Sequence, residues 1–309
     1  MKQLKSWISA FRLRTLPLSI SGAIVGSSYA YYLNYFDPII FILIILTTLS
    51  FQILSNLAND YGDGVKGTDN ETRIGPVRAL QSGVISPNQM KYAIIINAIL
   101  SAFLAILLVY VAFGGSHLLN SLIFIVLGGI SIYAAITYTV GKSAYGYRAL
   151  GDLMVFLFFG WLSVMGSYFL FAKNIDAKLL LPASAIGLLS TAVLNLNNMR
   201  DLETDQKSNK ITLAGHLGPK NSKLYHFMLI LLAIVLVLIF QYKLTFSTIM
   251  YFSWVAFLPL LFHLKGVYFI DHPKDFDPHL KRVALSTFAF AVLFAIALII
   301  EHTHHLNLH

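Results

Sequence analysis

The sequence predicts an all-α protein, a multi-pass bundle of nine transmembrane helices. The chain of 309 residues is 57% hydrophobic and 12% charged, whereas soluble proteins carry about 25% charged residues. It contains nine mostly apolar runs of the length that crosses a bilayer, which is about 20 residues for a helix. Because the runs lack the alternating polarity of β-barrel strands, each of them is predicted to be a helix.

The nine predicted helices follow one another along the chain. The first run follows a basic segment, as in a signal peptide, but no small-residue cleavage site is obvious and many spans follow, so we expect it to be retained. The absence of Cys excludes disulfides and thiolate metal sites. The predicted spans are residues 17–36, 38–58, 92–112, 117–139, 152–172, 178–198, 225–242, 246–264 and 284–301.

Basic residues predict how the bundle lies in the membrane. With nine spans, nineteen of the 22 Lys and Arg residues fall on one face. The positive-inside rule then places the N-terminus and two long loops, about 59–91 and 199–224, in the cytoplasm. We expect one membrane-embedded domain over residues 1–309 in the inner (cytoplasmic) membrane, with these two long loops, which we take to be functional, facing the cytoplasm.

The net charge of the chain is +8, spread through the membrane loops without forming a basic domain. This pattern argues against nucleic acid as a partner. Anionic lipid or a phosphorylated substrate is the expected partner instead.

Two acidic clusters end apolar runs on the predicted cytoplasmic face. Carboxylates beside a bilayer are costly, so several in one place indicate a function. If the helices continue through the clusters, spacings of three, four and seven residues put these side chains on one helix face. The side chains are Asn56, Asn59, Asp60 and Asp63 in the first cluster, and Asn197, Asn198, Asp201 and Asp205 in the second.

The chemistry of these clusters points to a metal-bound diphosphate. Oxygen ligands suit Mg²⁺, which binds a few carboxylates together with substrate phosphates. Arg73 and Arg78 follow the first cluster and Lys210 follows the second, and such cations contact phosphate oxygens directly. The alternative is that the acids are solvated helix ends paired with local Lys and Arg.

A third polar group lies between the fourth and fifth predicted helices, around Tyr138 and Lys142. Lys142 is a candidate to contact diphosphate oxygens, and Tyr138 to hold or protonate the leaving group. The alternative is an interfacial aromatic belt with a snorkelling lysine. A further acidic stretch, residues 271–279, is expected to be a solvated loop and not a lid over the site.

The acidic motifs resemble those of a known family. Asn56-x-x-Asn59-Asp60-x-x-Asp63 and Asp201-x-x-x-Asp205, together with nine helices, are similar to the UbiA superfamily of intramembrane prenyltransferases. The stretches 11–17, 54–83 and 146–152 look like those of members that act in menaquinone synthesis. The resemblance covers roughly residues 8–220 and fades in the last three helices.

The resemblance implies an Mg²⁺-dependent transfer of a polyprenyl group from polyprenyl diphosphate to 1,4-dihydroxy-2-naphthoate, with loss of CO₂, giving demethylmenaquinone. It implies that Asp60, Asp63, Asp201 and Asp205 hold magnesium and diphosphate, and that Arg73, Arg78, Tyr138 and Lys142 contact the diphosphate. The chain departs from the family where Ile211 and His216 replace the usual Arg, which puts phosphate contacts there in doubt.

Other functions remain open at this stage. Within the superfamily the acceptor could be 4-hydroxybenzoate, homogentisate or haem. From another class, a secondary transporter also uses polar residues in repeated helix bundles, near the membrane midplane. Mid-span charges are nearly absent here, which favours the enzyme.

Overall fold

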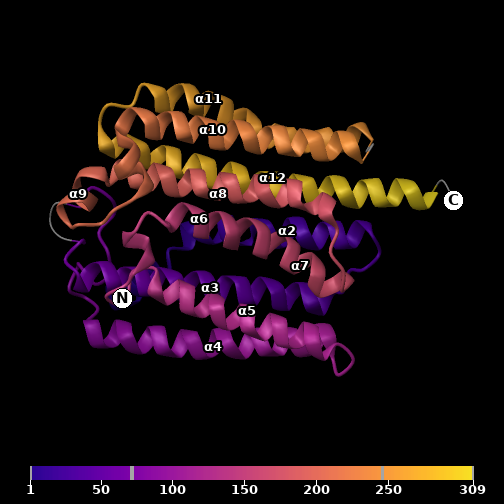
Figure 1. The fold of residues 1–309 in the computed structure, drawn as a ribbon, viewed down its shortest axis with the longest axis horizontal. Helices are drawn as coiled ribbons and strands as arrows, with labels where there is room; N and C mark the ends of the chain where they lie inside the picture. Colours follow the sequence, from indigo (N-terminus) through magenta and orange to yellow (C-terminus); the bar gives the residue numbers. More distant parts are fainter. Residues whose placement is uncertain (1, 70–72, 245–246, 308–309) are drawn as a thin grey trace.

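The computed structural model describes residues 2–69, 73–244 and 247–307. This part of the chain consists of α-helices that run along one long axis and are joined by turns and loops (Figure 1). The α-helices are α1 (Lys2–Phe11), α2 (Leu16–Tyr32), α3 (Pro38–Val65), α4 (Pro87–Phe113), α5 (Leu118–Thr137), α6 (Gly151–Val155), α7 (Ser163–Ala172), α8 (Leu180–Arg200), α9 (Leu202–Lys207), α10 (Leu213–Lys243), α11 (Leu258–Tyr268) and α12 (Phe276–Asn307). The remaining elements are the 3₁₀ helices η1 (Leu13–Thr15), η2 (Tyr145–Tyr147), η4 (Ala177–Leu179), η5 (Thr248–Phe257) and η6 (Pro273–Asp275), and the π-helical segment η3 (Phe156–Leu162).

All nine predicted spans have a counterpart in the described residues. Eight are helices long and apolar enough to cross a membrane, among them the continuous rods Gly151–Ala172 and Thr248–Tyr268. The ninth, α2, is 17 residues long. The prediction of an all-α, nine-helix membrane bundle is therefore confirmed.

The two acidic clusters sit on different local structures. Helix α3 continues through the first cluster to Val65, as predicted. The second cluster is broken, because α8 ends at Arg200 and α9 begins at Leu202. Between them Asp201 has φ −93° and ψ 9°, in the bridge region of the backbone. The prediction of one continuous helical face is wrong for the second cluster.

Helix α8 lies at the centre of the packing. It packs against α10, α12 and η3. In the apolar 18-residue stretch of this span 67% is buried inside the protein, compared with 17% in the corresponding stretch of α5. Close approach depends on small residues, as is usual between membrane helices. A Cβ added to Gly160 would lie 2.7 Å from the Ala183 carbonyl oxygen of α8.

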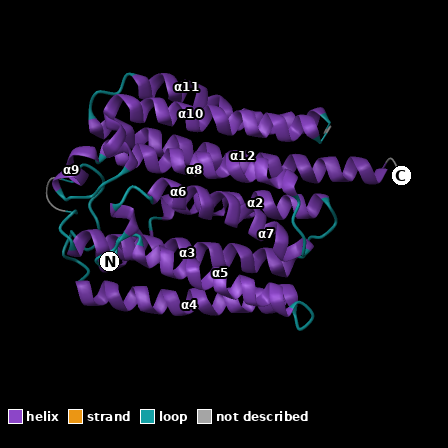
Figure 2. Cartoon of the chain, in the orientation of Figure 1, coloured by secondary structure: helices purple, strands orange, loops and turns teal. Residues whose placement is uncertain are grey.

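Loops and short helices gather at the two ends of the bundle (Figure 2). The N-terminal helix and α9 lie at one end, and the C-terminus lies at the other (Figure 1). The acidic clusters, at the end of α3 and the junction of α8 with α9, share the end that holds the N-terminus. The fold thus brings together two clusters that are far apart in sequence.

Replacing Gly26 with valine is expected to destabilise the bundle. An added Cβ at Gly26 would lie 2.1 Å from the carbonyl oxygen of Val164, so α2 and α7 would have to separate. Over-packing of this kind costs about 1–3 kcal/mol, which corresponds to a fall in Tm of roughly 5 °C. Thermal unfolding in detergent measures it. Gly129→Val is the control, since nothing lies within 4 Å of that position; an equal loss there would contradict the packing argument.

Candidate active site

A cavity of about 570 Å³ opens between the ends of α3, α5 and α8 and runs into the bundle. Its inner walls are mainly apolar, with Phe51, Phe124, Leu127 and Phe158 among them. Its other end is polar and collects most of the residues predicted for the site. These are Asn56, Asn59, Asp63, Arg73, Arg78, Tyr138, Asn197, Asn198, Asp201 and Lys210.

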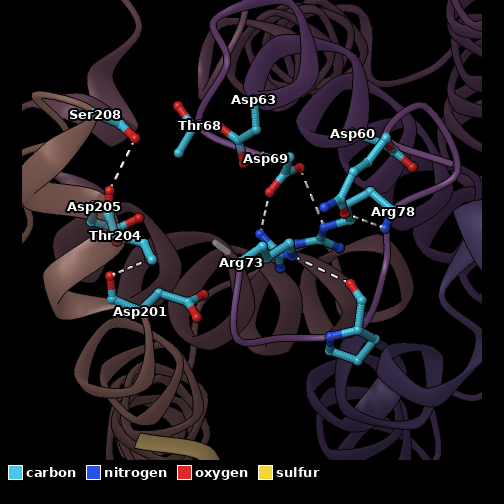
Figure 3. A network of polar contacts seen from close by, with 12 residues as sticks. Asp60, Asp63, Thr68, Asp69, Arg73, Arg78, Asp201, Thr204, Asp205 and Ser208 are labelled. Carbon is cyan, nitrogen blue, oxygen red and sulfur yellow. Dashed lines mark hydrogen bonds and ion pairs between the residues drawn. The ribbon is translucent and has the colours of Figure 1, made fainter. Parts of the chain in front are cut away.

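The first cluster divides its acids between the cavity and the scaffold. Asp63 lines the cavity, and its Oδ1 accepts a hydrogen bond from the Tyr147 hydroxyl at 2.8 Å. Asp60 is 1% exposed and does not line the cavity. Its two carboxylate oxygens accept from the backbone N–H groups of Ala79 at 3.1 Å and Leu80 at 3.2 Å. In this state Asp60 holds the loop that follows Arg78 (Figure 3).

The asparagines of the first cluster attach α3 to its neighbours. The Asn56 amide donates to the Phe11 carbonyl oxygen at 2.9 Å and to the Thr15 hydroxyl at 3.2 Å. Asn59 accepts from the Thr139 hydroxyl at 3.3 Å. Both side chains therefore fix the position of the acids while still lining the cavity.

Asp201 in the second cluster is held by its sequence neighbour Arg200. The guanidinium of Arg200 donates to both oxygens of Asp201, at 2.8 and 2.6 Å, and to Asn197 at 2.7 Å. Its Nη1 also donates to Asp277 at 2.5 Å. Burial raises the pKa of Asp201, but the hydrogen bonds and charge of Arg200 outweigh this and lower it below its usual value.

Lys210 supplies the positive charge between the two clusters. Its Nζ lies 3.3 Å from Asp205 Oδ1, and it lines the cavity. Burial lowers the pKa of Lys210, but attraction to Asp63 and then Asp205 raises it above its ordinary value overall. Burial also raises the pKa of Asp205, to about 6. Because Lys210 pairs with Asp205 and lines the same cavity as Asp63, the two clusters face a common space.

The loop after the first cluster carries two arginines into this space. Arg73 forms an ion pair with Asp69, and Arg78 Nε lies 3.6 Å from the other Asp69 oxygen (Figure 3). The loop also reaches the second cluster, because a Cβ added to Gly75 would lie 2.9 Å from Arg200 Nη2. Asp69, which is 6% exposed, thus positions the two arginines predicted to bind phosphate. Asp69 was not among the predicted site residues.

Tyr138 and Lys142 lie in different environments. Tyr138 lines the cavity, and burial raises its pKa to about 12, so its phenol stays protonated and can donate a hydrogen bond. Lys142 is exposed and does not line the cavity. Its contact with diphosphate remains a prediction, whereas Lys210 is the lysine that the structure brings to the acids.

Sequence reasoning missed several residues of the polar end. The segment after α1 contributes Arg12 and Arg14, which were considered for the topology and within the motif of residues 11–17 but were not predicted as site residues. Arg12 is half-buried, and its Nε and Nη2 atoms are buried with no hydrogen-bond partner within the described residues. Asp277 was expected in a solvated loop; this is wrong, because Asp277 is bonded to Arg200 and lines the cavity. The sequence signals available for Arg12 and Arg14 were their closeness to the first span and their place in the family-like stretch 11–17.

The donor set suits a hard divalent cation. Among the described residues, no three Asp, Glu or His side chains converge on one metal position. Both clusters nevertheless offer oxygen ligands, and Asp205 Oδ2 is buried without a hydrogen-bond partner in the described part of the chain. Mg²⁺ typically takes one or two carboxylates and completes its octahedron with water and phosphate oxygens. The residues fit Mg²⁺ that arrives together with a phosphorylated ligand.

Comparisons with solved structures agree with this fold. The apo structure of a UbiA homolog from Aeropyrum pernix K1 superposes with a TM-score of 0.69 at 16% identity, over 94% of this chain and 98% of that one. A UbiA homolog from Archaeoglobus fulgidus bound to GPP and Mg²⁺ superposes with a TM-score of 0.61 at 15% identity, over 98% and 100%. At these identities the likeness supports the fold.

Comparisons of the sequence show the family as well as the fold. The protein named 1,4-dihydroxy-2-naphthoate octaprenyltransferase of Escherichia coli (strain K12) is 42% identical over 301 residues, 96% of each chain. The protein of the same name from Haemophilus influenzae is 39% identical over 97% of each chain. The model of the UbiA prenyltransferase family matches residues 19–291. The chain belongs to the UbiA prenyltransferase family.

Proposed function

We propose that this protein transfers a polyprenyl group from polyprenyl diphosphate to 1,4-dihydroxy-2-naphthoate with loss of CO₂, giving the hydroquinone form of demethylmenaquinone for menaquinone synthesis. The observation that carries the proposal is a single cavity with acids and cations at one end and apolar walls beyond. The polar end suits a diphosphate, and the apolar part suits a prenyl chain. The acceptor follows from relatives 42% and 39% identical over nearly their full length, which bear the name of this activity.

At the polar end of the cavity, the acids and the cations have different roles in binding the prenyl diphosphate. Asp63 and Asp201, supported by Asp60 and Asp205, would hold Mg²⁺, which when bound neutralises the charge of a departing diphosphate. Arg73, Arg78 and Lys210 would contact its oxygens directly, as cations commonly bind phosphate. Asn56, Asn59, Asn197 and Asn198 would orient this shell, and Lys142 would have to move in from the surface to contribute.

The reaction requires stabilisation of the negative charge on the leaving diphosphate and exclusion of water from the allylic cation. The allylic C–O bond breaks and its electron pair leaves with the diphosphate, where the positive side chains stabilise the developing charge. The ring carbon that bears the carboxylate attacks the allylic carbon, and loss of CO₂ returns an electron pair to the ring. Tyr138 keeps its proton and can donate a hydrogen bond to a diphosphate oxygen. The apolar walls exclude water, which would otherwise capture the cation.

The acceptor assay tests the proposal directly. Purified protein is incubated with Mg²⁺, farnesyl diphosphate and either 1,4-dihydroxy-2-naphthoate, 4-hydroxybenzoate or homogentisate, and products are read by mass spectrometry. We expect a farnesylated ring that has lost CO₂ from the naphthoate alone. A prenylated hydroxybenzoate would instead identify another UbiA-type acceptor. No product with any acceptor would favour a transporter.

We also propose that the chain is one domain in the inner membrane, with its N-terminus and polar cavity end facing the cytoplasm. The charge asymmetry of the loops supports this orientation. Because the chain has no Cys, single cysteines can report it. Ser143→Cys and Ser116→Cys lie in exposed turns at the two ends of α5. In intact spheroplasts an impermeant maleimide should label Ser116→Cys, and label Ser143→Cys only after lysis. The reverse pattern would overturn the orientation.

A further inference from the structure

A second cavity, of about 610 Å³, lies on the outer side of α6, η3, α8 and α10. We call it the lateral groove; its lining includes Asp152, Leu153, Thr191, Tyr225, Leu232 and Val235. It shares no lining residue with the candidate active site within the described chain. The span Gly151–Ala172 separates the two, since Leu153 faces the groove while Met154 and Val155 face the active-site cavity.

The polar end of the lateral groove has an unused acceptor. Asp152 is 6% exposed, and its Oδ1 has no hydrogen-bond partner among the described residues. The Tyr225 hydroxyl interacts with the same carboxyl group. The Thr191 hydroxyl is directed elsewhere, to the backbone carbonyls of Asp152 at 3.3 Å and Gly187 at 2.9 Å. Buried carboxyl oxygens are nearly always hydrogen-bonded, so Asp152 is suited to a ligand that donates a hydrogen bond.

The rest of the lateral groove is apolar and elongated. Tyr225 and Val235 both line it from α10, ten residues apart, which is about 15 Å along a helix. Leu232, between them, is 48% exposed on a membrane-spanning helix, so the groove opens toward lipid tails. This length accommodates a hydrocarbon chain that lies along the helix.

The charges around the lateral groove limit which head groups such a ligand can carry. No Lys, Arg or His is found among the groove-lining side chains of the described chain. A phosphate head would therefore lie near the Asp152 carboxyl with no cation beside it, and like charges repel strongly in a medium of low dielectric constant. Phospholipids and prenyl diphosphates are disfavoured, and a neutral head with a hydroxyl group is favoured.

We propose that the lateral groove binds a prenylated hydroquinone. One ring hydroxyl donates to the free oxygen of Asp152, the ring lies against Phe156 and Tyr225, and the tail follows α10 toward Val235. Loss of CO₂ in the proposed reaction leaves such a hydroquinone, so the choice of ring rests on the proposed function. The groove would then hold product-like molecules beside the enzyme, apart from the site that makes them.

A binding experiment tests this with a defined probe, 2-geranyl-1,4-naphthohydroquinone, kept reduced under anaerobic conditions. Native mass spectrometry measures its Kd for the purified protein, with Mg²⁺ and geranyl S-thiolodiphosphate filling the active site. We expect binding that is at least tenfold weaker for the dimethyl ether of the probe, which has no donor. Leu232→Trp fills the groove and should weaken binding at least tenfold. Leu238→Trp, 43% exposed on the same helix but outside the groove, should leave it unchanged.

Three results would overturn the inference. They are equal affinity of the two tryptophan variants, equal affinity for the dimethyl ether, and retention of a phospholipid that the probe does not displace and that Leu232→Trp removes. The readout involves no turnover. Failure of the naphthoate assay therefore leaves the binding result intact, and failure of binding leaves the proposed activity intact.

Discussion

Asp63→Asn and Asp201→Asn are each expected to lower the rate of prenyl transfer about a thousandfold, the upper range for loss of one electrostatic group in an active site. Both acids line the cavity, one from each cluster. An amide of the same shape keeps the packing but loses the charge that attracts Mg²⁺. Initial rates with farnesyl diphosphate measure the effect, and chelation of divalent ions should abolish transfer by the unmodified protein in the same assay.

Glu203→Gln is the matched control for these variants. Glu203 lies between Asp201 and Asp205 in sequence but is exposed, and it does not line the cavity. Its replacement should leave the rate within about twofold, as is usual for surface positions. Near-normal turnover in both Asp63→Asn and Asp201→Asn would refute a site built from two clusters.

Arg200→Met is expected to produce the largest loss of stability among the single variants. The Arg200 side chain is 2% exposed and bonds Asn197, Asp201 and Asp277. Removing one partner of a buried ion pair costs about 3–5 kcal/mol, because the other charge is left buried and unpaired. Tm measured in detergent with a chelator present should fall by roughly 10 °C.

A double variant separates the two causes of this loss. In Arg200→Met with Asp201→Asn, the uncompensated carboxylate is gone, so the Tm should recover part of the difference. The single variant Asp277→Asn should cost less, since the Asp277 side chain is 37% exposed and can be solvated. A Tm unchanged in Arg200→Met would show that the network does not stabilise the fold.

The nine spans were predictable because each carries its own signal, a run of about 20 apolar residues. Local spacing also predicted the helical path through Asn56, Asn59 and Asp63, because α3 continues to Val65. It failed at Asp201, where the helix breaks. The bond from Arg200 to Asp277 joins α8 to α12 across 77 positions, and no local pattern predicts such a contact.

Sequence patterns also could not show which of the two predicted lysines lies beside the acids. Lys142 and Lys210 both follow membrane helices and look equivalent in sequence. The structure leaves Lys142 exposed and lays Lys210 beside Asp205, because the chain from α9 folds back so that Ile211 pairs with Arg148. Asp69 was missed for a related reason, since its value to Arg73 and Arg78 depends on burial that only the folded loop creates.

The charges at the mouth of the cavity are largely paired with one another in this state. Arg73 is bound to Asp69, Arg200 to Asp201, and Lys210 to Asp205. At these three pairs a free anion would have to displace a carboxylate from its cation, and a free metal ion would have to displace a cation from its carboxylate. A magnesium diphosphate offers both kinds of replacement in one molecule, so each broken pair is re-formed with the ligand. These three pairs are therefore expected to favour binding of the complete metal-bound donor over binding of either of its parts.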